Sequence, residues 1–476
     1  MLGNELLTDR YRYKWLILRY IENYKNHFCT LFNLSNILEI SSYKVERYLE
    51  EINDDLKLIG SDSSVELTFK SEIVSTRIDH LLLKKMRIKY LYDCEMFTML
   101  HNFFVSELPI KKQLDHLHIS QSASYLLHRE LKDILSEEKL KLKNNQVLGN
   151  ELDVRSIFFS TYYELFNGIK NPFPEKIRKM SLAILNQLTE QFLLNIPKTK
   201  ELKLLLFLDV WLIRISNGHY MDKSYVTYER LDFTHWLKKM LITLYDLPEE
   251  VAEHEMAYLA MFFHFEIDKV TFIDDYAVSE AYEQATALTK EFCRLFSEWF
   301  HYELTQPTLL MELTDINVKW LIYHFREQSF IVKEKFNYFQ EINPRLDQFI
   351  KAFIQKIEKK QIFQSDAERN KLYYDYLFLL VTKVPIENIE EPIYICIDFS
   401  HGNNYNQYIR IMLSSLQSMN IYYQEKIDAA TNLFLSDCAM ENLSCEQLIW
   451  KKPPTSDDWK DLGELLVIIK EQNSEG

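Results

Sequence analysis

Glycine is scarce in this chain of 476 residues, where it occurs eight times. A protein of this length would ordinarily hold several times as many, since glycine makes up about 7% of residues. The eight glycines also lie far apart, at positions 3, 60, 149, 168, 218, 402, 463 and 476. Loops that cradle phosphates or present a nucleophilic serine need two or three glycines within a few residues. The sequence therefore excludes the dinucleotide loop G-x-G-x-x-G, the P-loop and the G-x-S-x-G elbow.

The chain is acidic overall, but its charge is unevenly spread. Lys and Arg number 55 and Asp and Glu number 70, which gives a formal charge of -15. The first 150 residues hold 21 of each sign, so the whole acidic excess lies in the remaining residues. If any part of the chain approaches a polyanion, it is therefore expected to be the N-terminal third. Apolar residues make up 47% of the chain, and its length allows about three to five domains with cores of their own.

Cysteines and apolar runs indicate a cytoplasmic protein without a membrane segment. The six cysteines form no C-x-x-C pair, and five of them lie in apolar surroundings, so we expect reduced, buried thiols. The N-terminus shows no signal-peptide pattern, and the longest apolar run, 202–215, contains three charged residues. His116 and His118 are too closely spaced to share one helix face, and no catalytic set is found. We therefore expect no enzymatic activity, no cofactor and no metal.

Residues 10–56 predict a first helix-turn-helix unit. Apolar residues recur every three or four positions over 16–24, a second helix fits 31–38, and Ser41 or Ser42 is placed to cap a third helix. A short second helix, a tight turn and a capped third helix follow the order of helix-turn-helix proteins. Residues 58–69 predict two short strands around 60–64, which would form a wing. The exposed face of the third helix offers the candidate DNA contacts Ser42, Tyr43, Lys44 and Arg47.

The same order recurs over residues 92–148. A helix is expected over 92–105, Pro109 opens a short helix to 117, and Ser120 caps a third helix. Residues 140–148 alternate around Asn144-Asn145, which predicts a hairpin and thus a second wing. The third helix is expected to bury Ala123, Leu126, Leu127, Leu131, Ile134 and Leu135. Its free face holds Ser124 and His128 and offers the candidate DNA contacts Gln121, Ser122, Tyr125 and Arg129.

A short basic run at 84–89 is a further candidate for DNA contact. Two tandem patterns, each with a serine before the third helix and a strand pair after it, favour DNA binding over generic three-helix packing. Basic side chains and helix N-termini contact phosphates, whereas polar side chains on the third helix reach base edges in the major groove. The alternative for the basic run is a solvated helix face. Its candidate contacts to the DNA backbone are Lys84, Lys85, Arg87 and Lys89.

Helical patterns fill the middle of the chain, and a small α/β pattern ends it. Residues 154–383 predict two blocks of about five helices each, separated by breaks that contain proline. Residues 393–399 read as a continuous apolar strand, which is typical of a buried parallel sheet. A helix is then expected at 405–419, strands at 432–436 and 447–451, and a last helix at 457–470.

This order of segments resembles a known family. Gly149-Asn150-Glu151 before Val154-Arg155 resembles the start of a phosphotransferase-regulation domain, a five-helix module usually found in tandem, and 247–260 resembles a late helix of that module. With the two helix-turn-helix units and a tail similar to enzyme IIB, the whole chain resembles the Mga/AtxA-like virulence regulators of Gram-positive bacteria. The resemblance implies a mainly α, multidomain fold. Its domains would be 1–70, the first helix-turn-helix unit; 71–153, the second, winged unit; 154–270 and 271–384, the regulation domains; and 385–476, the enzyme-IIB-like α/β domain.

The resemblance also implies control by phosphocarrier proteins of the sugar phosphotransferase system, which phosphorylate histidines in such modules. The family positions fall near Glu201, Phe262 and Leu379, and none of these is a histidine. The tail has Ser400 and His401 where enzyme IIB carries a phosphorylated cysteine, which implies a domain without catalysis. A phosphoryl group adds roughly two negative charges and resets a helical interface. The remaining candidate sites are His324, His219 and His264.

Two functions remain open from the sequence. The first is a DNA-binding transcriptional regulator of the Mga/AtxA type, which binds double-stranded DNA as a homodimer or higher oligomer. The second is a phosphotransferase-linked scaffold that binds proteins and whose N-terminal helices do not touch DNA. A continuous basic face on residues 1–150 favours the first function, whereas scattered charges favour the second.

Overall fold

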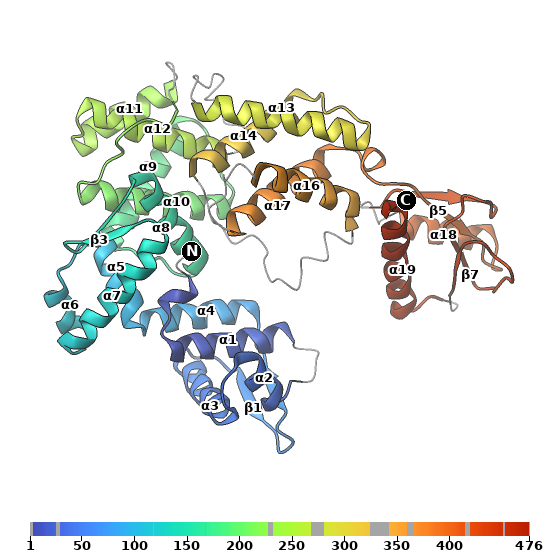
Figure 1. The fold of residues 1–476 in the computed structure, drawn as a ribbon, viewed down its shortest axis with the longest axis horizontal. Coiled ribbons are helices and arrows are strands. Elements are labelled where there is room, and N and C mark those ends of the chain that lie inside the picture. Colours follow the sequence, from blue (N-terminus) through green and yellow to red (C-terminus); the bar gives the residue numbers. More distant parts are fainter. Residues whose placement is uncertain are drawn as a thin grey trace. The chain divides into compact units, whose positions relative to one another are not determined.

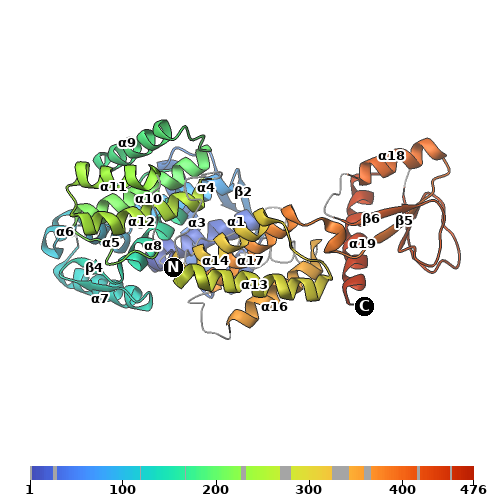
Figure 2. The ribbon, with the colours of Figure 1, turned by 90° about the horizontal axis from the view of Figure 1, so that it is seen from above.

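The computed structural model forms two compact bodies (Figures 1 and 2). The N-terminal body holds residues 3–267, and the C-terminal body holds residues 280–322 and 342–475. The fold is mainly helical with a small parallel sheet in the C-terminal body, as the sequence predicts. The structure describes residues 3–24, 29–117, 119–166, 168–226, 232–267, 280–323, 342–358, 366–414, 419–450 and 453–475. In these residues, no helix combines the length and apolar character that crossing a membrane requires.

The N-terminal body begins with a first helix-turn-helix unit, residues 9–77. After a 3-10 turn at Asn4–Leu6 (η1), its elements are α1 (Asp9–Asn23), α2 (Leu31–Leu38), α3 (Ser42–Leu58), β1 (Ser64–Leu67) and β2 (Ile73–Thr76). The Ser41 hydroxyl accepts a hydrogen bond of 3.3 Å from the backbone N–H of Lys44, so the predicted cap of α3 is confirmed. The order helix, turn, capped helix and hairpin therefore forms as expected.

The position of the first hairpin differs from the sequence prediction. Helix α3 continues to Leu58, and β1 pairs antiparallel with β2 from Ser64 opposite Thr76 to Leu67 opposite Ile73. Gly60 has a φ of 69° and closes the end of α3, where its N–H donates to the carbonyl of Lys57. The prediction of strands around 60–64 is thus wrong, because that glycine terminates a helix. The expected domain boundary between residues 70 and 71 also falls inside this hairpin.

A second helix-turn-helix unit, residues 95–148, follows a connecting helix. The connecting helix is α4 (His80–Tyr92), and the unit consists of α5 (Glu95–Val105), α6 (Ile110–Leu117), α7 (Gln121–Glu137), β3 (Lys141–Lys143) and β4 (Gln146–Leu148). The Ser120 hydroxyl accepts from the N–H of Ala123 at 3.2 Å, which confirms the second cap. Asn144 and Asn145 have φ values of 52° and 66°, the left-handed pair that a two-residue hairpin requires. Both predictions for this unit therefore hold.

Five helices complete the described part of the N-terminal body, with α10 at their centre. Their bounds are α8 (Glu151–Phe166), α9 (Glu175–Gln191), α10 (Lys198–Ser216), α11 (Asp232–Tyr245) and α12 (Glu249–Glu266). Helix α10 packs against α8, α9 and α12, and its residues 203–215 are all buried. The three charges in this run are paired: Lys203 with Glu266 at 2.9 Å, Asp209 with Arg178 at 3.0 Å, and Arg214 with Glu151 at 2.7 Å. Because each charge is compensated, the largely apolar run 203–215 is buried along its whole length. We call α8–α12 the helical block.

The C-terminal body joins a second group of helices to an α/β layer. The described helices are α13 (Glu280–Phe300), α14 (Pro307–Tyr323), α16 (Pro344–Glu358) and α17 (Asp366–Lys383). Their core is strongly aromatic, with Phe292 packed edge-on against Phe349 and Phe353. The sequence prediction of a helical middle is confirmed for these residues.

The α/β layer is a four-stranded parallel sheet in the order β6-β5-β7-β8. After a 3-10 turn at Ile386–Asn388 (η3), its elements are β5 (Ile393–Ile397), α18 (Asn403–Leu413), β6 (Ile421–Gln424), β7 (Leu433–Ser436), β8 (Glu446–Ile449) and α19 (Ser456–Glu475). Strand β6 was not predicted, although it pairs with β5 along its length. Figure 2 shows the strands beside α18 and α19, whose apolar residues complete the core.

The six cysteines are free, and their burial is uneven. Cys29, Cys94 and Cys396 are buried, whereas Cys293 and Cys445 are half-buried. Cys438 follows β7 and is exposed, so the expectation of uniformly buried thiols is wrong at that position. Burial raises the pKa of Cys29, Cys293 and Cys396, which keeps these thiols protonated.

Candidate nucleic-acid interface

The start of helix α7 is open to solvent in the way that a DNA-reading helix requires. Gln121, Ser122, Tyr125 and Arg129 are all exposed, and they follow the capping residue Ser120 along one side of the helix. Two features differ from the expected faces. Ser124 is buried and donates to the carbonyl of Gln121 at 2.8 Å, whereas Leu126, expected in the core, is half exposed. The four candidate contacts of the second unit are therefore accessible, and Ser124 is not.

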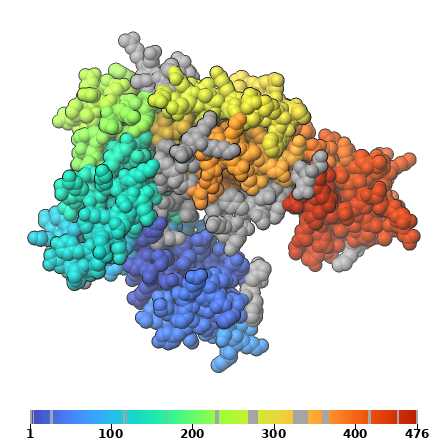
Figure 3. Space-filling model, viewed as in Figure 1, coloured from blue at the N-terminus to red at the C-terminus, as the bar shows by residue number. Residues whose placement is uncertain are grey.

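Exposed lysines gather on the elements that surround α7. Helix α6 and strand β3 both pack against α7, and the second unit is seen in cyan in Figure 3. Among the residues of this unit whose side chains the structure describes, the exposed carboxylates are Glu130, Asp133 and Glu137. No ion pair joins the exposed cations to another residue that the structure describes. These cations are Lys111, Lys112, Arg129, Lys132, Lys139, Lys141 and Lys143.

The equivalent surface of the first unit is different. Tyr43, Lys44 and Arg47 are exposed on α3, as is Ser42, but the Arg47 guanidinium donates to Glu51 at 3.1 Å. Among the described residues of this unit, the exposed cations are matched by exposed carboxylates: Asp9, Glu39, Glu46, Glu50, Asp54, Asp62 and Glu66. Large apolar side chains are also exposed here, including Tyr43 at 74% and Phe69, at the hairpin tip, at its full area. The first unit therefore lacks the cationic excess of the second.

The basic run at 84–89 lies on α4, and half of it is buried. Arg87 pairs with Glu164 of α8 at 2.8 Å and lies over the ring of Trp15. Lys89 pairs with Asp55 of α3 at 3.1 Å and also with Asp93. Arg87 and Lys89 thus hold helices together, which removes them from the set of candidate DNA contacts. Lys84 is half-exposed and Lys85 exposed, so the solvated-face alternative describes only part of this run.

The candidate phosphorylation sites are poorly placed or lie outside the described residues. His264 is largely enclosed, and burial lowers its pKa to about 4. His219 is half-buried, and its Nε2 lies 2.5 Å from a carboxylate oxygen of Glu107. His324 belongs to the part of the chain that the structure does not describe. An imidazole that accepts a phosphoryl group needs an accessible ring nitrogen; both ring nitrogens of His264 are buried, and Nε2 of His219 is engaged by Glu107.

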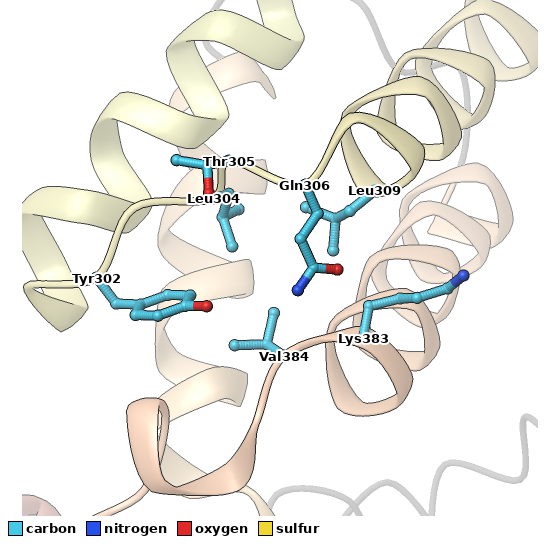
Figure 4. A pocket seen from close by; sticks show the side chains of 7 residues that line it. All are labelled: Tyr302, Leu304, Thr305, Gln306, Leu309, Lys383 and Val384. Carbon is cyan, nitrogen blue, oxygen red and sulfur yellow. The ribbon is translucent and has the colours of Figure 1, made fainter.

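A small hollow in the C-terminal body does not have the size of a ligand site. This hollow, at the ends of α13 and α17 and lined by residues such as Tyr302, Gln306 and Lys383, encloses an empty volume of about 170 Å³ (Figure 4). Pockets for organic ligands usually enclose about 300–1,000 Å³, so this hollow is too small for one. No group of three potential metal ligands exists among the described residues. In the loop after β5, the Ser400 hydroxyl donates to Asp437 at 2.6 Å.

Sequence reasoning missed the lysines beside α7 as functional candidates. It selected residues on the third helices and the basic run, where four cations lie within six residues. The wing instead alternates exposed Lys141 and Lys143 with buried Leu142, and α6 adds Lys111 and Lys112. The sequence already showed this alternation and predicted a hairpin from it. The polar face of that hairpin could have been interpreted as a surface that contacts phosphates.

Comparison with known proteins supports a DNA-binding role for this region. Residues 79–163 match the family model of the Mga helix-turn-helix domain, and no curated protein matches the chain. The matched residues begin at Asp79, the cap of α4, and run through the second unit into α8. They therefore include α7, the lysine-bearing hairpin and the helix α4 that carries the basic run. Residues 79–163 form an Mga-type helix-turn-helix domain, and this domain supports the resemblance of the chain to Mga-like transcription regulators.

Proposed function

We propose that the protein is a DNA-binding transcriptional regulator of the Mga/AtxA type whose second helix-turn-helix unit is the main DNA-binding element. The observation that carries the proposal is the excess of exposed cations on α7 and on the elements packed against it, none of them ion-paired to another described residue, beside the open N-terminal end of α7. Double-stranded DNA carries closely spaced phosphates, and protein cations that replace their counterions supply most of the non-specific affinity. The match of residues 79–163 to the Mga helix-turn-helix domain supports the same assignment.

The arrangement of the second unit fits a known mode of docking. Helix α7 would enter the major groove with its N-terminal residues against base edges, as the third helices of such units do. There Gln121 would pair with an adenine edge and Arg129 with guanine or a phosphate, since their side chains offer the matching donors and acceptors. The hairpin β3–β4 would lie along the phosphate backbone, where Lys141 and Lys143 carry the positive charge. In this proposal Lys85 and Lys84 reach phosphates beside the main contact.

The remaining parts of the chain would regulate this contact. We assign the helical block and the helices of the C-terminal body to two phosphotransferase-regulation domains, and the parallel sheet to an enzyme-IIB-like domain. With β2 placed in the first unit, the expected domain boundaries become 1–77, 78–150, 151–270, 271–384 and 385–476. The protein would act as a homodimer or higher oligomer. In this proposal, control by phosphocarrier proteins rests mainly on His324, because His264 is enclosed and Nε2 of His219 is held by Glu107.

The alternative, a scaffold that does not bind DNA, predicts scattered charges over residues 1–150. The first unit has that character, but the second does not. The two functions therefore predict different charge distributions on the second unit. A substitution in that unit is the experiment that distinguishes them.

The test measures binding of the full chain to a fluorescent random-sequence duplex at 50 and 200 mM salt. We expect salt-sensitive binding by the unsubstituted protein and its loss in Lys141→Glu/Lys143→Glu, because reversed charges repel phosphates. Lys176→Glu/Lys179→Glu on α9 makes the same change of charge on an exposed helix outside the unit and should bind as the unsubstituted protein does. Absence of binding at 50 mM salt, or equal loss in both variants, would reject the proposal.

A further inference from the structure

The loop between α5 and α6 holds one residue in an unusual conformation. Glu107 has a φ of 50°, in the left-handed region that residues with side chains rarely adopt. Glu107 directly follows the C-cap of α5, where a left-handed residue commonly ends a helix. This turn places its side chain between two separate parts of the N-terminal body.

Glu107 joins the wing to the helical block. Its Oε2 accepts a hydrogen bond of 2.5 Å from the amide of Gln146, the first residue of β4 after the hairpin turn. Its Oε1 lies 2.5 Å from Nε2 of His219, in the loop that follows α10. One carboxylate therefore bridges the wing tip and the helical block, and its side chain is 17% exposed.

Further contacts tie the same loop of the helical block to the second unit. The Asn217 amide donates to the carbonyls of Phe104 and Val105 at 3.3 Å each, at the end of α5. These carbonyls lack partners within their own helix, as the last carbonyls of any helix do. The loop that carries His219 thus also closes the C-terminal end of α5.

The loop is in turn fixed by buried charges inside the helical block. Arg155 of α8 donates to the carbonyl of His219 at 3.1 Å and pairs with Glu255 of α12 at 2.7 Å. The same Glu255 carboxylate accepts from the N–H of Met221 at 2.8 Å. A continuous path of hydrogen bonds therefore runs from α12 through the 219–221 loop and Glu107 to the wing.

We propose that Glu107 is a positioning residue that couples the helical block to the wing and so sets how the wing presents its lysines to DNA. This inference rests on the proposed function and deepens it. A wing tip that is already held in place before binding loses little conformational freedom when it contacts the duplex. The entropic cost of binding that a mobile tip would add is therefore avoided. A displacement of α12 would move the 219–221 loop and, through Glu107, the tip that carries Lys143. The residues of the path reach the wing without touching DNA.

The first test uses the sign of the effect on DNA affinity. Removing a carboxylate near a polyanion site should tighten binding if charge alone matters. The proposal predicts the opposite for Glu107→Ala, a weakening of about fivefold to tenfold on a random-sequence duplex at 100 mM salt. Glu130→Ala is the matched control, because it removes the same charge from an exposed position on α7. It should bind as tightly as the unsubstituted protein or more tightly.

The second test asks whether the effect passes through the wing. If Glu107 acts by placing the tip, Lys143→Ala/Glu107→Ala should bind within about twofold of the weaker single variant. Two independent losses that multiply would instead indicate general destabilisation and overturn the proposal. His219→Ala should reproduce Glu107→Ala from the other side of the contact, and His219→Gln, which keeps a donor, should restore binding. If Glu107→Ala does not fold, the His219 variants test the same coupling between the helical block and the wing.

The outcomes separate the two proposals. If the unsubstituted chain does not bind the duplex, the proposed function fails and this inference with it. If it binds and Glu107→Ala binds as tightly as Glu130→Ala does, the function stands and the coupling through Glu107 is rejected.

Discussion

In both helix-turn-helix units a serine caps the third helix and a two-stranded hairpin follows it, yet the surfaces around these helices differ. Among the residues whose side chains the structure describes, the second unit exposes seven cations and three carboxylates, whereas the first exposes more carboxylates than cations. The first unit instead exposes apolar side chains such as Phe32 and Phe69. The shared order of elements is thus a property of folding, and in the proposed function the capacity to bind DNA lies in the charges placed on it.

The interiors differ as well. The first unit encloses Lys14, which is 2% exposed and pairs with Asp55 at 2.5 Å and with Glu51 at 3.6 Å. The third helix of the second unit packs through Leu131 and Leu135 without a buried charge among its described residues. Buried ions are destabilising unless compensated, so the first unit depends on a few specific pairs and the second on apolar packing.

The largest effect is expected from Asp55→Asn, which removes the carboxylate paired with both Lys14 and Lys89 and leaves the buried Lys14 ammonium with the more distant carboxylate of Glu51. Loss of one partner of a buried pair costs about 3–5 kcal/mol of stability. Hydrogen exchange at pH 7 should show α1 and α3 opening more readily, with α7 unchanged. Asp54→Asn is the control, since Asp54 is exposed one residue away. Equal exchange in the two variants would mean that the pair does not stabilise the first unit.

The same pair predicts a pH dependence. Burial alone would raise the pKa of Asp55, but the adjacent Lys14 and Lys89 ammonium groups outweigh it and lower the pKa below its ordinary value of 3.8. A carboxyl with a lowered pKa in the folded state contributes stability above its unfolded pKa and loses it as pH falls through the folded pKa. The difference in stability between the unsubstituted protein and Asp55→Asn should therefore have its full size at pH 7 and should shrink below about pH 4. A difference that stays constant down to pH 2 would contradict the ion pair.

The next effect compares the units on DNA. Lys139→Ala/Lys141→Ala/Lys143→Ala should weaken binding to a random duplex by about 100-fold and flatten the salt dependence by about three in log–log slope. The matched variant in the first unit is Lys44→Ala/Lys57→Ala/Lys70→Ala, which removes the same charge from exposed positions. It should change affinity by less than about threefold, since those lysines lie among carboxylates. Equal losses of affinity in the two variants would indicate that both units contact DNA.

A smaller effect distinguishes base contact from phosphate contact at one residue of each unit. Arg129 is exposed without an ion pair to another described residue, whereas Arg47 is held by Glu51. Loss of a base contact costs about 1–3 kcal/mol and relaxes specificity at one position. In a selection from a pool of random DNA duplexes, the DNA sequence preferred by Arg129→Ala should therefore differ from that of the unsubstituted protein at one base pair. The DNA sequence preferred by Arg47→Ala should be unchanged. An unaltered sequence with uniformly weaker binding in Arg129→Ala would make Arg129 a phosphate contact.

Local signals in the sequence predicted what depends on a few neighbouring residues. Two serines predicted two helix starts, and Asn144-Asn145 predicted a left-handed turn, because each feature needs only its own short segment. The prediction of a hairpin turn at Gly60 was wrong because glycine is equally suited to a hairpin turn and to the end of a helix. The actual turn, near Ser71 with a φ of 59°, contains no glycine and is fixed by pairing with the start of α2.

The features that the sequence did not reveal depend on distant partners. The basic run read as a surface, because its partners Asp55 and Glu164 lie far from it in the chain. Strand β6 is a short edge strand whose place is set by β5. The bridge through Glu107 joins three segments that are separate in sequence. The candidate helix α7 was therefore predictable, and the charges that distinguish it from α3 became interpretable only once their partners were known.

The smallest effect is also the one that best separates folding from function. Ser41→Ala and Ser120→Ala each remove a hydroxyl that accepts from the third backbone N–H of the following helix, at 3.3 and 3.2 Å. Each loss should cost about 1 kcal/mol, visible as faster amide exchange in the first turn of α3 or α7. Because the caps are equivalent, the two local losses should be equal. Because only α7 meets DNA in the proposed function, only Ser120→Ala should also weaken binding to the duplex. Weakening by Ser41→Ala to the same degree would show that the first unit reads DNA despite its balanced charge.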